Sequence, residues 1–458
     1  MSLTRTIELI FRRFLPSPFV IALLLTLLTM VLALVFGQFP EGTPAWEGVL
    51  TSWEHGLWNR GLLVFAYQMM LILVLGHVLV LSKPMERLIL RLTSLAKNGA
   101  SAAFLVIFST TLVSFFNWGL GLIFGALLAR KVGEHARDRK IPLNYPLIGA
   151  CGYAGLMVWH GGISGSAPIK VSEPGHLASL LEGVLPVAAL AEFPDTIPSS
   201  ATIFSSWNLA LFFLVAASIS GLAFYLGRTT APTHIALPDY RFSEEDVSPA
   251  KGAEKLDRSS GLSLLLAGMI FLAFLVQYLP QLRSLNLTPD MLNFFMLGLA
   301  VLLHGNIRRF LGAVEEAIGD TSGILIQFPL YFGIMGIMTE SGLIHQISDF
   351  FVAISSSATF PIFTFFSAGL VNIFVPSGGG QWAVQGPVIL EAAQTLQVPL
   401  PKAVMALAYG DQLTNMLQPF WALPLLGITQ LKAREILPYT LLFMVLGGLI
   451  FLGGLWFL

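Results

Sequence analysis

One acidic residue lies deep in an apolar part of the sequence. Asp411 falls within residues 403–430, where no other residue carries a formal charge. A charged side chain at the centre of a bilayer costs at least ~2.5–3.5 kcal/mol, so acidic residues at membrane depth are by default functional. We expect Asp411 to bind a coupling ion, either by taking up a proton or by helping to ligate Na⁺. Capping of a broken half-helix is the alternative.

Two histidines share this apolar setting. His77 lies within residues 61–82, and His160 lies where the apolar run 143–165 changes into a glycine-rich stretch. Histidine is the side chain whose charge changes most readily near neutral pH. We predict a proton relay through His77 or His160, and a hydrogen bond that merely supports packing is the alternative for each.

Four segments concentrate Gly, Asn, Ser and Pro inside apolar sequence. Broken backbone is tolerated at membrane depth only where it lines a cavity or is packed in protein. Half-helix ends offer free N–H groups to anions and free carbonyl groups to cations. Close helix packing through small residues is the alternative. These segments supply the residues expected to bind a substrate, which are Asn117, Trp118, Gly119, Gly121, Gly161, Gly162, Ser164, Ser166, Asn372, Ser377, Gly378, Gly379, Gly380, Gln381, Trp382, Asn415 and Gln418.

The composition shows which kind of protein must position these residues. Of 458 residues, 55% are hydrophobic and 11% charged, against roughly 25% charged in an average soluble domain. The 25 basic and 26 acidic residues leave no basic surplus for nucleic acid. The single cysteine, Cys151, excludes internal disulfides and cysteine-based metal clusters. We predict an all-α polytopic protein of the lipid bilayer without metal or cofactor.

A spanning helix needs about 20 mostly apolar residues. Two apolar stretches, 99–129 and 358–392, are too long for one crossing and are interrupted, so each is expected to form a re-entrant hairpin. Nine other runs qualify as spans: 18–37, 61–82, 143–165, 200–227, 261–280, 287–304, 321–340, 403–430 and 436–457.

The placement of charges predicts the topology, since Lys and Arg accumulate in short cytoplasmic loops. Basic residues precede the first span and flank both ends of 99–129, whereas both ends of 358–392 lack them. The two hairpins therefore enter from opposite sides. The N-terminus is expected inside and the C-terminus outside.

The order span, span, hairpin, span, span occurs twice, and the second copy is inverted if one extra helix intervenes. Inverted repeats are a signature of secondary transporters. A weak echo pairs Gln68 with Gln327, Asn117 with Asn372, Tyr153 with Tyr409 and Pro168 with Pro424. The predicted division is a cytoplasmic N-terminus at 1–17, a first repeat at 18–227, a cytoplasmic linker at 228–260, a linking helix at 261–280 and a second repeat at 287–457.

The absence of Lys and Arg from the predicted spans favours a weakly charged anion such as a monocarboxylate, although a neutral solute fits equally well. A channel is an alternative to a carrier. Gly162-Ile163-Ser164-Gly165 matches an intramembrane serine protease pattern, but no deep histidine follows it. An aspartyl mechanism needs two carboxylates, and only Asp411 is available. An enzyme is therefore not expected.

The motifs Asn117-Trp118-Gly119-Leu120-Gly121, Val375-Pro376-Ser377-Gly378-Gly379-Gly380-Gln381-Trp382 and Gln418-Pro419-Phe420-Trp421-Ala422-Leu423-Pro424 resemble those of the bacterial short-chain fatty acid transporter family. The resemblance covers nearly the whole chain. It implies uptake of small monocarboxylates such as butyrate or acetoacetate across the bacterial inner membrane. It also implies membership of the wider ion transporter superfamily, with a scaffold, a hairpin-bearing transport unit and a homodimer. His160 departs from the glycine usual in the family.

These observations lead to one hypothesis. The substrate carboxylate is expected between the hairpin tips, near Asn117, Ser164, Asn372, Ser377 and Asn415. Alternating access would move the transport unit against the scaffold, driven by an H⁺ or Na⁺ gradient. The alternative is an ion-coupled carrier of another small solute, such as a dicarboxylate or an amino-acid conjugate.

Overall fold

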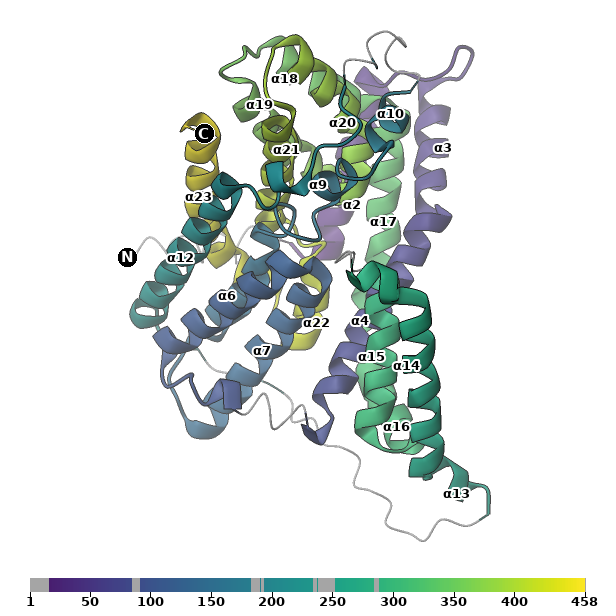
Figure 1. Ribbon diagram of the computed structural model, residues 1–458, viewed down its shortest axis with the longest axis vertical. Helices are drawn as coiled ribbons and strands as arrows, with labels where there is room; N and C mark the ends of the chain where they lie inside the picture. The colour runs from purple at the N-terminus through teal and green to yellow at the C-terminus, as the bar shows by residue number, and fades with distance from the viewer. Residues whose placement is uncertain are drawn as a thin grey trace.

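The structure, a computed structural model, is built from helices packed at steep angles to one another (Figure 1). It describes residues 16–84, 91–182, 190, 193–233, 237, 252–283 and 288–457. Within these residues every regular element is an α-helix or a 3₁₀-helix. The predicted all-α class is confirmed. Most of the predicted N-terminal segment 1–17 and of the linker 228–260 lies outside the described residues.

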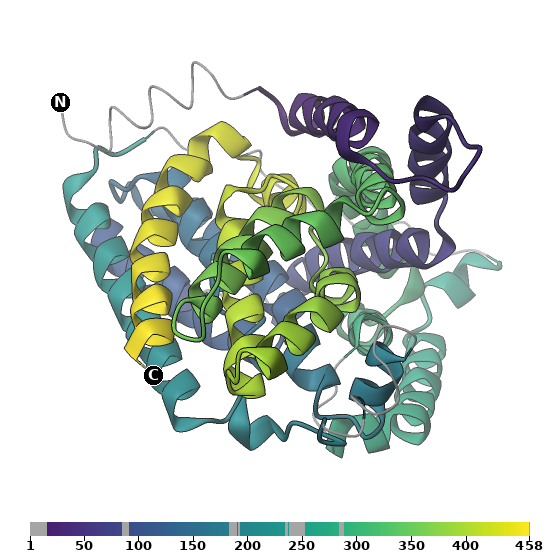
Figure 2. The same ribbon diagram turned by 90° about the horizontal axis from the view of Figure 1, so that it is seen from above.

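One side of the molecule forms what we call the scaffold. Viewed from above, its purple helices α2 and α3 lie at the edge opposite the teal α12 and the yellow α23 (Figure 2). Within it α4 packs on α15 and α16, and α17 packs on α2, α3 and α4. The scaffold comprises α2 (Pro18–Phe36), α3 (Ala45–Leu57), α4 (Arg60–Val80), α14 (Ser260–Arg283), α15 (Pro289–His304), α16 (Ile307–Ala317) and α17 (Ser322–Glu340).

The other side holds two helical hairpins. The first joins α6 (Gly99–Phe116) to α7 (Trp118–Arg139), and the second joins α19 (Phe360–Phe374) to α20 (Gly378–Thr395). Asn117 breaks the first hairpin with extended backbone, and its side chain accepts a hydrogen bond from the Leu120 N–H, which caps α7. Ser377 caps α20 in the same way by accepting from the Gly380 N–H. The hairpins extend from opposite ends of the molecule and their tips lie in its interior (Figure 1).

Two predicted spans are broken inside the molecule. Span 143–165 becomes α8 (Tyr145–Tyr153) and η1 (Ala154–Met157), followed by turns that lead to α9 (Ser166–Lys170) and α10 (His176–Leu181). Span 403–430 becomes α21 (Leu400–Thr414), η4 (Asn415–Leu417) and α22 (Ala422–Thr429). We call residues 158–165 the first break and residues 415–421 the second break. The remaining helices on this side are α12 (Ser206–Thr229), α18 (Leu343–Ala353) and α23 (Ala433–Phe457).

The span count can now be compared with the helices. Within the described residues, 7 helices are long and apolar enough to cross a membrane. One of them is α6, an arm of the first hairpin, so six of the nine predicted spans are continuous helices of that length. The other three are the two broken spans and α15, which has only 16 residues. Runs of apolar residues therefore located each segment, and the stretches rich in Gly, Asn, Ser and Pro indicated the two spans that are broken.

Helix α3, which lies in the segment between the first two spans, packs along α17. Three glycines bring the backbones together, because a Cβ at Gly56 or Gly336 would overlap with the facing backbone and a Cβ at Gly333 would overlap with Trp53. Such small-residue contacts are common between membrane helices.

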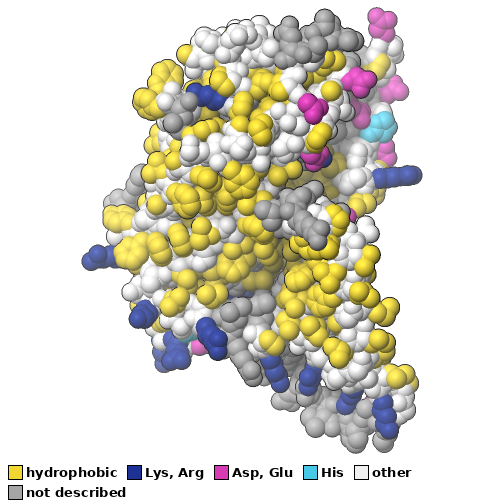
Figure 3. Space-filling view, viewed as in Figure 1, with side chains coloured by type: hydrophobic (Ala, Val, Ile, Leu, Met, Phe, Trp, Pro, Cys, Tyr) yellow, Lys and Arg dark blue, Asp and Glu magenta, His cyan; other side chains and the backbone are white. Residues whose placement is uncertain are grey.

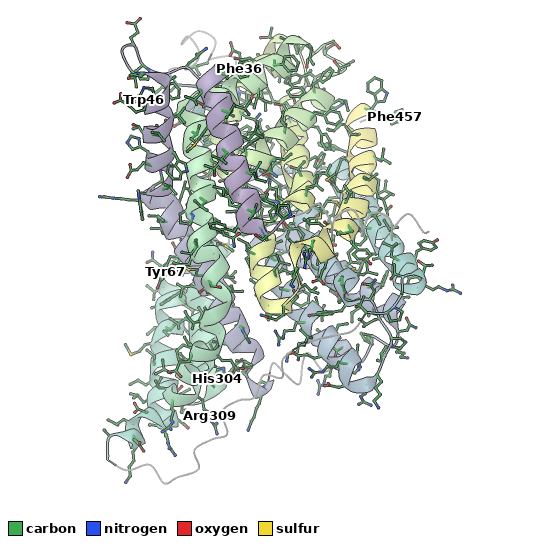
Figure 4. All side chains as sticks on the ribbon, turned by 180° about the vertical axis from the view of Figure 1, so that it is seen from behind. Phe36, Trp46, Tyr67, His304, Arg309 and Phe457 are labelled. Atoms are coloured by element: carbon green, nitrogen blue, oxygen red, sulfur yellow. The ribbon has the colours of Figure 1, made fainter. Side chains whose placement is uncertain are left out.

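On the face shown in Figure 3, charged and hydrophobic side chains lie in different zones. Most Lys and Arg side chains visible in Figure 3 gather at the lower end and most Asp and Glu side chains at the upper end, with hydrophobic side chains between them. Figure 4 shows Phe36 and Trp46 at one end and His304 and Arg309 at the other. Between these ends Leu264 and Val276 of α14 are largely exposed. The chain is therefore a multi-pass membrane protein whose apolar belt faces lipid.

Candidate functional site

The two breaks meet through one buried polar pair. His160 of the first break hydrogen bonds through Nδ1 to the Oδ2 atom of Asp411, and both side chains are buried. The neighbouring Gln412 holds the same break in place, because its Oε1 atom accepts from the N–H groups of His160 and Gly161, each at 2.9 Å. The acidic residue and the histidine that sequence reasoning treated separately thus form one unit.

The hydrogen bonds of His160 identify where its proton lies. The Ala167 N–H donates to Nε2 of His160 at 3.0 Å, so this nitrogen carries no hydrogen in the neutral ring. The ring hydrogen is then on Nδ1, directed at Asp411. The His160 ring therefore donates to Asp411 through Nδ1 and accepts from Ala167 through Nε2, so that both ring nitrogens are engaged.

Two tyrosines tie each repeat to the break of the other. The Tyr153 hydroxyl of α8 donates to the carbonyl oxygens of Asn415 and Gln418 in the second break, at 2.8 and 3.1 Å. The Tyr409 hydroxyl of α21 donates to Oδ1 of Asn208, whose amide group donates to the Gly161 carbonyl oxygen in the first break at 3.0 Å. The pairing of Tyr153 with Tyr409 in the sequence echo corresponds to this reciprocal arrangement.

Amide side chains surround the second break. The Asn372 amide group donates to the carbonyl oxygen of Asp411 and to the side chains of Thr414 and Asn415, and the Gln418 amide group donates to the Asn372 carbonyl oxygen. Among the described residues, the buried side-chain carbonyl oxygens of Asn372, Gln418 and the nearby hairpin residue Gln381 accept no hydrogen bond.

The tip of the first hairpin joins the first break and the scaffold. The Trp118 N–H donates to Oγ of Ser164 at 2.9 Å. The Trp118 ring lies 5.1 Å from that of Trp421 and 6.2 Å from that of Phe65 in the scaffold, measured between centroids. This aromatic cluster fills the space between the hairpin tip and α4.

A cavity of about 460 Å³ lies on the other side of the first break. Ser164, Ser166 and the first turn of α20, at Gly379, contribute its polar wall, and Trp382 contributes an aromatic one. Lys170 also lines the cavity, and its Nζ atom is 2.8 Å from Glu173, with both side chains about half exposed. The one lysine of the lining is thus already paired, and hydroxyl and backbone groups remain to receive a ligand.

A histidine closes one side of this cavity. The Trp382 indole N–H donates to Nε2 of His176 at 3.0 Å, so His176 must be neutral at that nitrogen. Burial lowers the pKa of His176 below its ordinary value of 6.5, Lys170 lowers it further, and Glu173 partly offsets both. Because the folded-state pKa lies below 6.5, this contact is formed above pH 6.5 and is lost as the pH falls through the folded-state pKa.

We therefore expect acidification to loosen the His176–Trp382 contact. The test places a cysteine at Ser166 in a chain whose buried Cys151 is replaced by Ala. Its rate of reaction with a maleimide, divided by the rate in the same chain carrying His176→Gln, should rise several-fold as the pH is lowered from about 8 through the folded-state pKa of His176. Glutamine accepts the same hydrogen bond at every pH, so it corrects for the intrinsic reactivity of the thiol. A ratio to the control that does not change with pH would contradict the prediction.

The structure sorts the predicted binding residues into groups. Ser164, Ser166, Gly379 and Trp382 line the cavity, and Asn372, Asn415 and Gln418 lie in the buried network around Asp411. Asn117 acts as a helix cap. Several predicted residues serve close packing instead, since a Cβ would meet a neighbour at Gly121, Gly161, Gly162 and Gly378, Gln381 donates within its own hairpin, and Gly119 and Gly380 lie in the first turns of α7 and α20.

His77 lies apart from this site. It is buried in α4, between residues that pack with α15 and α16, and it does not line the 460 Å³ cavity. Sequence reasoning in turn missed Asn208, Gln412 and His176. Gln412 was adjacent to Asp411 and could have been noticed, whereas Asn208 and His176 occupy segments without an interruption or an isolated charge that would mark them.

Comparison with known proteins identifies the family of this chain. The family model for short chain fatty acid transporters matches residues 1–458. A protein of Escherichia coli strain K12, provisionally named a short-chain fatty acid transporter, is 37% identical over 453 residues, which cover 97% of this chain and 96% of that protein. One of Haemophilus influenzae with the same provisional name is 35% identical over 456 residues, 97% of each chain.

Two solved structures are more distant. The Alcanivorax borkumensis YdaH transporter, described as having an unusual topology, is 16% identical with a TM-score of 0.44, over 96% of this chain and 98% of that one. Neisseria gonorrhoeae MtrF, described within a class of antimetabolite efflux pumps, is 15% identical with a TM-score of 0.44, over 98% and 97%. At these values the likeness carries no argument about the site. The full-length family match and the two relatives establish that this chain belongs to the short chain fatty acid transporter family.

Proposed function

We propose that this transporter carries short-chain monocarboxylates, such as butyrate or acetoacetate, by alternating access. The observation that carries the proposal is the chemistry of the 460 Å³ cavity. Its polar wall includes Ser164, Ser166 and the first turn of α20, and its one lysine, Lys170, is paired with Glu173, which also lines the cavity. Hydroxyl and backbone N–H groups bind a single carboxylate well. A dicarboxylate would need a free cationic side chain to offset the desolvation of its second carboxylate.

Proton coupling is the second part of the proposal. The His160–Asp411 pair lies between the two breaks, and the Ala167 N–H that fixes His160 opens α9, whose first residue, Ser166, lines the cavity. Occupation of the cavity and protonation of the pair therefore act on the same turn. Substrate binding that shifts Ser166 changes the hydrogen bond to His160 and with it the proton affinity of the pair.

Sodium coupling is the second candidate, and one observation favours it. Among the described residues, the buried side-chain carbonyl oxygens of Asn372 and Gln418 accept no hydrogen bond. Asn372 donates to the Asp411 carbonyl oxygen, and Gln418 donates to the Asn372 carbonyl oxygen. Amide oxygens are ligands that hard cations take. Na⁺ would then travel as a co-substrate at the second break.

The deciding experiment uses purified protein in liposomes with separate pH and Na⁺ gradients. We expect accumulation of labelled butyrate or acetoacetate with an inward proton gradient, and counterflow exchange without any gradient. Accumulation only with Na⁺ would favour the second candidate. Transport of dicarboxylates or amino-acid conjugates without monocarboxylates would refute the substrate class, and flux without counterflow would indicate a channel.

The charge distribution supports a topology that is part of the same proposal. The end rich in Lys and Arg (Figure 3) faces the cytoplasm of a bacterial inner membrane. The N-terminus is then cytoplasmic and the C-terminus periplasmic. A homodimer, which the family resemblance implies, completes the proposed state.

A further inference from the structure

The 460 Å³ cavity has a charged wall beside its polar one. Lys170 and Glu173 both line the cavity, and Nζ of Lys170 lies 3.2 and 2.8 Å from the two carboxylate oxygens of Glu173. The Lys170 side chain is 50% exposed and the Glu173 side chain 41%. The lysine charge thus borders the cavity with a carboxylate of the chain itself already bound to it.

The backbone holds this ion pair in place. The Glu173 N–H donates to the Lys170 carbonyl oxygen at 3.1 Å, which closes a tight turn directly after α9. Within this turn Val171 is fully buried, packs in one cluster with Trp382 and accepts from the Ile197 N–H at 2.7 Å. Helices α9 and α10 both lie against α20 (Figure 1). The pair is therefore carried on a segment that is packed on the second hairpin.

The spacing along α9 relates the pair to the proposed carboxylate site. Ser166 of the polar wall begins α9 and Lys170 ends it. Residues i and i+4 lie on the same face of a helix, and a rise of 1.5 Å per residue separates these two by about 6 Å. The carboxylates of a four-carbon dicarboxylate are separated by a comparable length. A dicarboxylate with one carboxylate at Ser166 would therefore place the other at Lys170, where Glu173 already lies.

We propose that Glu173 excludes dicarboxylates, because its carboxylate takes the place at Lys170 that the second carboxylate of such a substrate would need. A monocarboxylate needs no partner there. A dicarboxylate has either to displace Glu173 from Lys170 or to hold its second carboxylate beside that of Glu173, and like charges disfavour each other. This role of Glu173 rests on the proposed monocarboxylate function and deepens it, because it names the residue that selects for the charge of the substrate.

The test compares two four-carbon acids with the full-length protein in liposomes, at about pH 7.5, where carboxylic acids of ordinary pKa are ionised. Counterflow of labelled butyrate is inhibited by unlabelled succinate and, separately, by unlabelled butyrate. The measured quantity is the half-inhibitory concentration of succinate divided by that of butyrate. Glu173→Gln should lower this ratio about fivefold, which is the upper end for an ion pair between half-exposed side chains.

Glu182→Gln is the matched control. Glu182 directly follows α10 in the same segment, is exposed and does not line the cavity, so the same chemical change there should keep the wild-type ratio. The double variant Lys170→Gln with Glu173→Gln tests the part of the lysine. It should return the ratio to about the wild-type value, because the freed cation is no longer present.

Lys170→Gln alone tests the same pair if Glu173→Gln folds poorly. It leaves the charge of Glu173 at the cavity without its partner, so succinate should inhibit more weakly relative to butyrate and the ratio should rise. An unchanged ratio in this variant contradicts the role of Glu173.

The outcomes distinguish this role from the proposed function. If the wild-type protein exchanges no butyrate, or if succinate inhibits as strongly as butyrate, the proposed substrate class fails and the role of Glu173 fails with it. If the wild-type protein prefers butyrate, and Glu173→Gln exchanges butyrate with the ratio of the Glu182→Gln control, the role of Glu173 alone is overturned. A lowered ratio that persists in the double variant overturns it as well, because Lys170 is then not the group that Glu173 occupies.

Discussion

Replacement of Asp411 by Asn should abolish gradient-driven accumulation of substrate while leaving counterflow exchange measurable. Asparagine keeps the shape of the side chain and its hydrogen bond with His160, but it cannot be ionised, so it cannot supply the change of charge that the proposed proton coupling requires. The loss of accumulation should exceed tenfold, since a carrier without an ion-binding step only equilibrates its substrate. Accumulation and counterflow are measured in the same liposome preparation.

Asp290→Asn provides the matched control. Asp290 lies in the first turn of α15 in the scaffold and accepts a hydrogen bond from Gln68 at 2.7 Å near the surface. The same chemical change there should leave both accumulation and counterflow intact. Wild-type accumulation in Asp411→Asn would remove this residue from the coupling step. Loss of counterflow as well would show instead that Asp411 is needed for binding or for folding.

The second large effect is expected at Gly165, which ends the first break. A Cβ at this position would overlap with the carbonyl group of His160. That group is part of the backbone, so no flexible side chain can move away to make room. Gly165→Ala must therefore open the turn closed by the hydrogen bond from its N–H to the Gly162 carbonyl oxygen, and it displaces His160 from Asp411. We expect a loss of about 1–3 kcal/mol in stability and of most transport activity.

Thermal unfolding and counterflow of Gly165→Ala measure these two effects. Gly221→Ala is the control, because a Cβ on this residue of α12 meets no atom within 4 Å. Alanine in a helix is favoured over glycine by about 0.5–1 kcal/mol, so this variant should be at least as stable as the wild type. A Gly165→Ala protein with wild-type stability and transport would show that the turn accommodates a side chain.

The hairpins could be predicted because two kinds of information agreed. Basic residues at both ends of 99–129 and none at the ends of 358–392 required each stretch to return to its own side. The stretches rich in Gly, Asn, Ser and Pro, which contain Asn117 and Ser377, indicated that each apolar stretch is interrupted. The outer boundary was less accurate, because α7 continues to Arg139, ten residues beyond the predicted end. Polar and charged residues form helix as readily as apolar ones once the helix leaves the bilayer.

The pairing within the site could not be predicted from the sequence. His160 and Asp411 are 251 residues apart, and no periodicity connects residues whose proximity arises from the crossing of two broken helices. Glycine was also ambiguous, since the same residue type lines the cavity at Gly379 and permits close packing at Gly162. Only the neighbours in three dimensions distinguish these roles.

The reciprocal tyrosine contacts have a consequence for how the protein is made. The bond from Tyr153 to Asn415 spans 262 residues of chain. At about 5–20 residues per second, the ribosome needs on the order of 10 to 50 seconds to synthesise the second partner after the first. During this interval the newly inserted first half holds an unsatisfied break in the membrane. The hydrogen bonds that close this break form only when the inverted counterpart has been made, so neither half is an independent unit of biogenesis.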